Sequence, residues 1–133
     1  MLLTKKRIFI VEDNVENRAI TMIILEREGA KTGFDRWGLD TVEKLKQFAP
    51  VDISLLDLMF PGNVTGFDVF GRIRAEPSLA LVPVIALTAS DPANMLHKVR
   101  SHGFAGFIRK PVDFEMFPRQ VRAILDGQSI WER

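Results

Sequence analysis

The chain has 133 residues, enough for one folded domain of ordinary size. Hydrophobic residues make up 47% and charged residues 26%, which predicts a globular fold and excludes a disordered chain. The formal net charge of +1 gives no general argument for binding nucleic acid or a membrane surface, and the absence of cysteine excludes disulfides and thiolate metal sites. We find no apolar run of membrane-spanning length and no signal peptide, so we expect a soluble cytoplasmic protein.

Apolar periodicity predicts five strands that alternate with five helices. Short apolar runs predict strands at residues 7–11, 30–34, 51–56, 82–87 and 104–108. Helical spacing predicts helices at residues 14–28, 39–48, 66–76, 91–103 and 113–125. This alternation predicts an α/β fold, in which a doubly wound parallel sheet carries helices on both faces.

We expect residues 1–133 to form a single domain with no output domain. The tail, residues 126–133, is too short for another domain, and Trp131 is expected either to dock or to fray. Both histidines, His97 and His102, are expected at the solvated surface. The sequence leaves open whether the chain is a stand-alone regulator or part of a longer protein.

Polar side chains follow four of the five predicted strands. They are Glu12 and Asp13 after the first strand, Asp57 after the third, Thr88 and Ser90 after the fourth, and Lys110 after the fifth. Open parallel sheets bind ligands at the carboxyl ends of their strands. If these four strands are neighbours, three carboxylates, hydroxyl groups and an ammonium group converge there.

Such a cluster has a specific chemistry. Three neighbouring carboxylates repel one another, which raises at least one pKa, and a hard divalent cation such as Mg²⁺ relieves the repulsion. A carboxylate that stays partly free can act as a nucleophile and form an aspartyl phosphate. Asp57 is therefore the predicted phosphoryl acceptor, with Thr88 donating a hydrogen bond and Lys110 supplying positive charge.

Taken singly, each of these residues has a commoner structural role. An aspartate at a strand end is usually a cap or turn residue, and the acids Glu12 and Asp13 suit the start of a helix. Thr88 alone suits a hydroxyl that bonds the local backbone, and Lys110 alone suits a solvated surface lysine. Their joint placement favours the functional interpretation.

At these residues the sequence resembles the receiver domains of two-component response regulators, chemotaxis regulators among them. The motifs are the acidic pair in "FIVEDN", the aspartate in "SLLDLMFPG", the threonine in "IALTAS" and the lysine–proline pair in "GFAGFIRKP", all in the family's order. The resemblance covers essentially the whole chain. It implies a five-stranded sheet in the order 2-1-3-4-5, an arrangement known from a chemotaxis protein of this fold.

The resemblance also implies a chemical role for each motif. Asp57 would take a phosphoryl group from the phosphohistidine of a histidine kinase or phosphotransfer protein. Mg²⁺ would be held by the carboxylates of Glu12, Asp13 and Asp57, with the backbone carbonyl of Met59 as a further ligand. Lys110 would contact the phosphoryl group, and the Lys110–Pro111 peptide bond is expected to be cis.

A conformational switch is implied as well. Phosphorylated Asp57 would draw in Thr88, and Phe107 would turn inward beneath the loop of Thr88. This would remodel the surface of the fourth helix, fifth strand and fifth helix, where a downstream effector is expected to bind. Taken alone, Phe107 is as readily a core residue as a switch.

Some positions depart from the family's common pattern. Glu12 replaces a frequent aspartate, Phe60 replaces the usual methionine, and the loop from Pro61 to Gly66 is one residue longer. Met59 and Ser90 stand where the family tunes autodephosphorylation, and the apolar Met59 predicts a long-lived phosphoryl group.

Other functions compete with this interpretation. The chain is not expected to be an enzyme beyond its own phosphoryl transfer and autodephosphorylation. The alternative is a receiver-like interaction module that is never phosphorylated, but the intact Asp57, Thr88 and Lys110 favour the phosphoacceptor. A flavin carrier of similar fold is disfavoured because Glu12 and Asp13 would repel a phosphate. A free-standing phosphatase lacks its second aspartate, because Met59 stands there.

Overall fold

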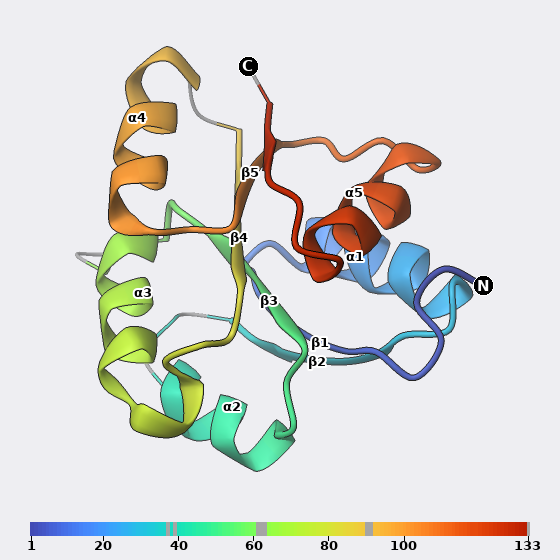
Figure 1. Ribbon diagram of the computed structural model, residues 1–133, viewed down its shortest axis with the longest axis horizontal. Coiled ribbons are helices and arrows are strands. Elements are labelled where there is room, and N and C mark those ends of the chain that lie inside the picture. The colour runs from blue at the N-terminus through green and yellow to red at the C-terminus, as the bar shows by residue number, and fades with distance from the viewer. Residues whose placement is uncertain (37, 39, 61–63, 90–91, 133) are drawn as a thin grey trace.

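A parallel sheet forms the centre of the molecule, and the first five strands follow the predicted order. The computed structural model describes residues 1–36, 38, 40–60, 64–89 and 92–132. The strands, all parallel, lie in the order β2-β1-β3-β4-β5-β6 (Figure 1). Their bounds are β1 Arg7–Val11, β2 Lys31–Asp35, β3 Ile53–Asp57, β4 Val84–Thr88, β5 Gly106–Arg109 and β6 Ile130–Trp131.

In the described part of the chain, five α-helices cover the two faces of the sheet. Their bounds are α1 Val15–Arg27, α2 Thr41–Phe48, α3 Gly66–Ala75, α4 Pro92–His102 and α5 Met116–Leu125, with a short 3-10 turn at Pro77–Leu79. Helices α1 and α5 lie on one face, and α2, α3 and α4 lie on the other (Figure 1). None of the helices in the described ranges is both long enough and apolar enough to cross a membrane.

Alternation along the strands divides the core into two clusters, one on each face. In β1, Ile8 and Ile10 join the cluster under α1 and α5, whereas Phe9 and Val11 join the cluster under α2, α3 and α4. Strands β3 and β4 are buried at every residue, as expected for central strands of a sheet covered on both faces. Asp57 is therefore the buried carboxyl end of a central strand.

Local signals begin the helices near the site. The Asn14 side chain accepts a hydrogen bond from the Asn17 N–H and caps α1, directly after the acidic pair. Thr65 and Asp68 form a capping box at the start of α3. The last helix begins at Met116 rather than at Asp113, and the Asp113 carboxylate accepts hydrogen bonds from the backbone N–H groups of Glu115 and Met116.

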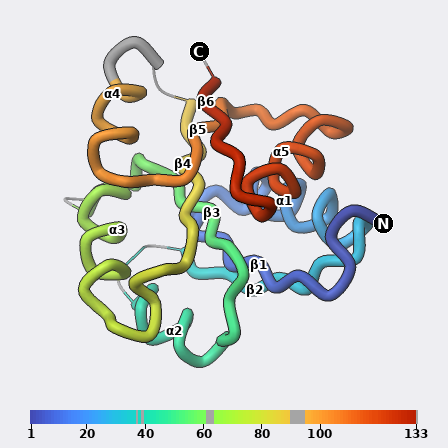
Figure 2. Tube along the Cα trace, in the orientation of Figure 1, coloured from blue at the N-terminus to red at the C-terminus, as the bar shows by residue number. Residues whose placement is uncertain are grey.

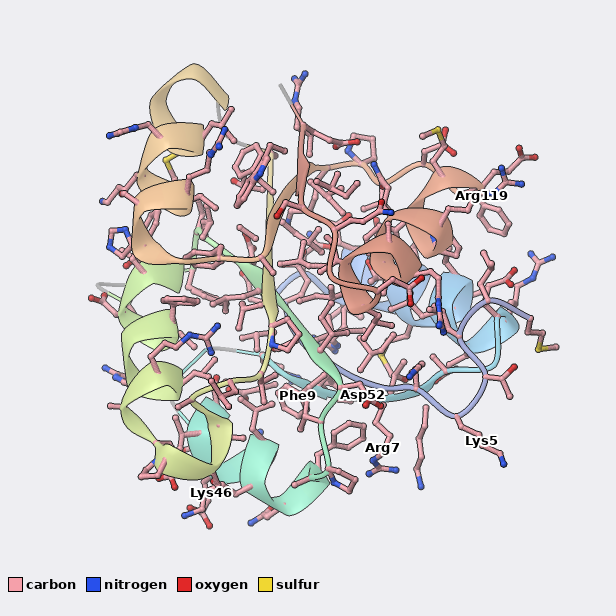
Figure 3. The ribbon with its side chains drawn as sticks, in the orientation of Figure 1. Lys5, Arg7, Phe9, Lys46, Asp52 and Arg119 are labelled. Carbon is pink, nitrogen blue, oxygen red and sulfur yellow. The ribbon has the colours of Figure 1, made fainter. Side chains whose placement is uncertain are left out.

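Arg7, the first residue of β1, fixes the amino-terminal end of the central strands (Figure 3). Its backbone N–H donates to the Asp52 carboxylate at 2.7 Å, and its guanidinium donates to the carbonyl oxygens of Phe48 and Pro50. These bonds hold the connection between α2 and β3 against β1. The predicted site residues lie at the other end of the strands, the carboxyl end.

The sixth strand corrects the predicted five-stranded sheet. Ile130 and Trp131 pair with β5 in parallel register, so Trp131 docks rather than frays (Figure 2). Periodicity did not reveal this strand because two residues are too few to show a pattern.

Candidate acidic site at the strand ends

The structure brings together the three carboxylates that follow β1 and β3. Oxygen atoms of Glu12, Asp13 and Asp57 lie within 4.8 Å of one another. Glu12 and Asp57 are buried, with 4% and 5% of their surface exposed, and Asp13 is half-buried. This is the convergence predicted from strand order.

Lys110 reaches the same cluster from the end of β5. Its Nζ lies 2.5 Å from Glu12 Oε1 and 3.3 Å from Asp57 Oδ2. Its backbone N–H donates to the carbonyl oxygen of Thr88, which places the chain just beyond β5 against the end of β4. The Lys110–Pro111 peptide bond is cis, as the resemblance implied.

The electrostatics of the cluster show an excess of negative charge. Burial raises the pKa of Glu12, and the neighbouring Asp57 raises it further against the opposing effect of Lys110. Burial and the nearby Glu12 raise the pKa of Asp13. Burial alone would lower the pKa of Lys110, but its hydrogen bond to Glu12 and the charge of Asp57 outweigh burial and raise it. One ammonium group therefore pairs with Glu12 and Asp57, in a cluster that holds three carboxylates.

This donor set fits a hard divalent cation. Carboxylate oxygens are the protein ligands that Mg²⁺ prefers, and three of them converge here with their mutual repulsion only partly neutralised. The cluster is thus compatible with a magnesium site formed by Glu12, Asp13 and Asp57.

The hydroxyl and the aromatic residue predicted for a switch are both buried. Thr88 ends β4 and has no exposed surface, and it pairs in register with Arg109. Phe107 is also fully buried, within the cluster under α2, α3 and α4. Its rotation on phosphorylation remains a prediction.

The loop beside the site is described in part. Met59 is 59% exposed, and its N–H donates to Asp57 Oδ1 at 3.2 Å. Ser90 and residues 61–63 of the longer loop lie outside the described residues. Gly66 follows the loop, and a Cβ built there would lie 2.4 Å from the Asp57 carbonyl oxygen. The backbone of Asp57 is therefore packed tightly against the start of α3.

Two residues near the site were not singled out from the sequence. Arg18 is buried on α1, where its guanidinium donates to the Glu12 carbonyl oxygen at 3.0 Å and stacks over Phe34. Asp35 ends β2, is buried, and accepts hydrogen bonds from Thr41 and Lys44. Arg18 could have been found from the sequence, because an arginine among the apolar positions of a helix is unusual. Asp35 could not, because its partners Thr41 and Lys44 lie beyond the connection between β2 and α2.

Comparison with known proteins identifies the arrangement. The family described as "Response regulator receiver domain" matches residues 8–122, which is most of the chain. The chain belongs to this family. Receiver domains are signalling proteins of two-component systems rather than ordinary enzymes, and they interact with histidine kinases or phosphotransfer proteins and with effectors.

Individual relatives agree with this assignment. The polar-differentiation response regulator DivK of Brucella ovis is 29% identical over 120 residues, which cover 90% of this chain and 96% of DivK. A putative response regulator from Chloroflexus aurantiacus has a TM-score of 0.83 at 20% identity, covering 92% of this chain and 99% of its own. The chemotaxis regulator CheY4 of Vibrio cholerae has a TM-score of 0.80 at 21% identity, and the match covers 91% of this chain and 99% of CheY4. These two structures support the receiver fold.

Proposed function

We propose that this receiver domain accepts a phosphoryl group on Asp57 from the phosphohistidine of a histidine kinase or phosphotransfer protein. The observation that carries the proposal is the contact of Lys110 with Asp57 and Glu12 inside a cluster of three carboxylates. An interaction module that is never phosphorylated has no need of this arrangement. The family supplies the class of donor.

The transfer is a displacement at phosphorus. A carboxylate oxygen of Asp57 attacks the phosphorus atom, and a P–O bond forms as the P–N bond of phosphohistidine breaks. The electron pair of that P–N bond leaves with the imidazole nitrogen, which takes up a proton from solvent. The protein contributes mainly position and neutralisation of charge.

Each neighbouring residue has a defined part in this proposal. Glu12, Asp13 and Asp57 would hold Mg²⁺ together with the Met59 backbone carbonyl, and the ion would neutralise charge on the phosphoryl oxygens. The Lys110 ammonium group would exchange part of its pairing with Glu12 for a phosphoryl oxygen. Thr88 would donate its hydroxyl hydrogen to another phosphoryl oxygen.

The conformational change that follows phosphorylation would reach the effector surface through the end of β5. Lys110 and Phe107 lie on the same strand and its extension, so a shift of Lys110 toward the phosphoryl group would move the backbone beside Phe107. We expect a downstream effector to read the surface formed by α4, β5 and α5. We expect this change to be a shift of population between two states, in which the ring of Phe107 turns inward beneath the loop of Thr88.

Intact-mass measurement after incubation with acetyl phosphate and Mg²⁺ tests the proposal. The wild-type chain should gain one labile phosphoryl group, the gain should require Mg²⁺, and Asp57→Asn should abolish it. Asp35→Asn is the matched control, since Asp35 is an equally buried strand-end acid outside the cluster. An adduct on Asp57→Asn would mean that another residue is the acceptor, and no adduct on the wild type under any donor and metal condition would favour the interaction module.

A further inference from the structure

The sixth strand covers the outer edge of β5, the strand that leads to Lys110. Helix α5 ends at Leu125, and Gly127 follows with a positive φ of 95° that lets the chain reverse. The Gln128 N–H then donates to the Ala123 carbonyl oxygen. The chain then runs back along β5, with Ile130 opposite Gly106 and Trp131 opposite Phe107. Figure 2 shows β6 beside β5, at the C-terminal end of the chain.

Specific contacts hold this segment in place. The Glu132 backbone N–H donates to the Phe107 carbonyl oxygen at 2.9 Å. The Glu132 carboxylate accepts from the Arg109 N–H and from Gln120 Nε2, both at 2.7 Å. Trp131 lies under the guanidinium of Arg100 on α4, 5.1 Å from ring centroid to Cζ. The segment therefore bridges α4, β5 and α5, the elements of the expected effector surface.

The attachment is small enough to be reversible. The strand has two residues, and both are only half-buried. It also leaves a polar group unsatisfied, because Gln120 Oε1 is buried without a hydrogen-bond partner in the described part of the chain. A strand with so few contacts opens at a low free-energy cost, so a small change in β5 is enough to shift its equilibrium.

The anchors of the segment lie next to the proposed phosphorylation site. Arg109, whose N–H binds Glu132, is bonded directly to Lys110, whose Nζ contacts Glu12 and Asp57. A new phosphoryl group on Asp57 attracts Lys110 and moves the adjoining peptide. Among the contacts that hold β6, the 2.7 Å hydrogen bond from the Arg109 N–H to Glu132 lies nearest to Lys110 along the chain.

We propose that β6 is an intramolecular latch on the outer edge of β5, docked while Asp57 is unmodified and released when Asp57 is phosphorylated. The inference rests on the proposed function. Release uncovers the Phe107 carbonyl, the Arg109 N–H and the surface beside Arg100. The freed edge fits an extended segment of an effector in which an aromatic side chain precedes an acidic one, as Trp131 precedes Glu132.

Tryptophan fluorescence of the full chain tests the latch. The sequence has two tryptophans, so Trp37→Phe leaves Trp131 as the only reporter. Quenching of Trp131 by acrylamide is measured before and after acetyl phosphate with Mg²⁺, and the intact mass of the same sample is recorded. We expect the quenching constant to rise several-fold with the adduct and to return as the phosphoryl group hydrolyses. If Trp37→Phe does not fold, wild-type chain labelled with 5-fluorotryptophan gives the same readout by ¹⁹F NMR, with Trp131→Phe for assignment.

The mass separates the two possible failures. An adduct with unchanged quenching overturns the latch and leaves the proposed function intact. No adduct overturns the proposed function and the latch with it.

A pair of substitutions at Glu132 tests the same latch from its other end. Glu132→Ala removes both side-chain anchors, so Trp131 should be accessible without a phosphodonor. Glu132→Gln keeps an acceptor for the Arg109 N–H, and its amide can donate to Gln120 Oε1, so it should behave as wild type. Unchanged quenching in a folded Glu132→Ala chain would contradict the latch.

Discussion

Buried acids lie at the carboxyl ends of neighbouring strands, yet their surroundings differ. Asp35 ends β2 and accepts hydrogen bonds from Thr41 Oγ1 at 2.6 Å, from Lys44 Nζ at 3.1 Å and from the Arg36 N–H at 2.9 Å. Glu12 and Asp13 follow β1, Asp57 ends β3, and Lys110 pairs with Glu12 and Asp57. Asp35 thus has three donors of its own, whereas Glu12 and Asp57 share one ammonium group beside a third carboxylate.

The difference appears as opposite shifts of pKa. Burial would raise the pKa of Asp35, but its bonds from Thr41 and Lys44 outweigh burial and lower it. Burial raises the pKa of Glu12 and of Asp13, and their partners do not compensate. A buried acid that is fully paired stabilises the fold, whereas acids left underpaired at the same edge of the sheet favour binding of a cation.

The largest expected effect comes from removing the charge of Asp35. Asp35→Asn weakens the bonds to Thr41 and Lys44, so the free energy of unfolding should fall by about 1.5–3 kcal/mol. Asp57→Asn removes one of three repelling charges, so its effect on the metal-free chain should be much smaller. Urea unfolding of both variants checks this contrast, which fails if Asp57→Asn costs as much as Asp35→Asn.

The next effect tests whether packing, rather than pairing, positions Asp57. A Cβ on Gly66 would meet the backbone of Asp57 and Leu58 at 2.4 and 2.6 Å, so Gly66→Ala should destabilise the chain by about 1–3 kcal/mol. Gly71 lies on the same helix with no neighbouring atom within 4 Å of a built Cβ. Gly71→Ala should therefore stabilise the chain by about 0.5–1 kcal/mol. Thermal melts of the two variants should shift in opposite directions, and equal shifts would show that the close approach is unimportant.

The smallest expected effect is one of pH on the metal-free chain. Because the pKa of Glu12 and that of Asp13 are raised, the folded chain binds protons first, and these groups add stability as the pH falls toward their ordinary values of 4.5 and 3.8. The lowered pKa of Asp35 acts in the opposite sense, because its contribution is complete above pH 3.8 and is lost as the pH falls through its folded value.

Unfolding measured with and without Mg²⁺ across pH isolates the contribution of the cluster. Protons compete with the ion for Glu12 and Asp13, so the gain in stability from Mg²⁺ should shrink at a pH still above 4.5. Asp35→Asn should show the same pH profile. A gain that stays constant down to pH 4.5 would mean that Glu12, whose pKa is raised above that value, does not bind the ion.

Much of this structure was predictable from the sequence. Buried strands between amphipathic helices, with glycine or proline at the helix ends, predicted five strands and five helices. The order of the first five strands was implied by the resemblance to receiver domains. Residue type at each strand end predicted that Glu12, Asp13, Asp57 and Lys110 would meet, because parallel strands align their carboxyl ends. The roles of Thr88 and Met59 remain predictions.

The remaining features depend on tertiary contacts that leave no local pattern. β6 is held by Arg109 and Gln120, which lie 23 and 12 residues away from Glu132 along the chain. The burial of Phe107 in the core agrees with its place in an apolar run, which alone left core and switch roles equally open. In the sequence, Asp35 looks like any polar residue at the end of a strand. Its role depends on the hydrogen bond from Thr41, which only the folded structure brings next to it.

The most direct test of the contrast between the two acidic regions is the shift in melting temperature caused by Mg²⁺. The wild-type chain and Asp35→Asn should be stabilised to the same extent, because ligand binding to the folded state alone raises its stability and both keep the whole cluster. Asp57→Asn should lose most of that shift. An undiminished shift in Asp57→Asn, or its loss in a folded Asp35→Asn chain, would contradict the assignment of the cation site to Glu12, Asp13 and Asp57.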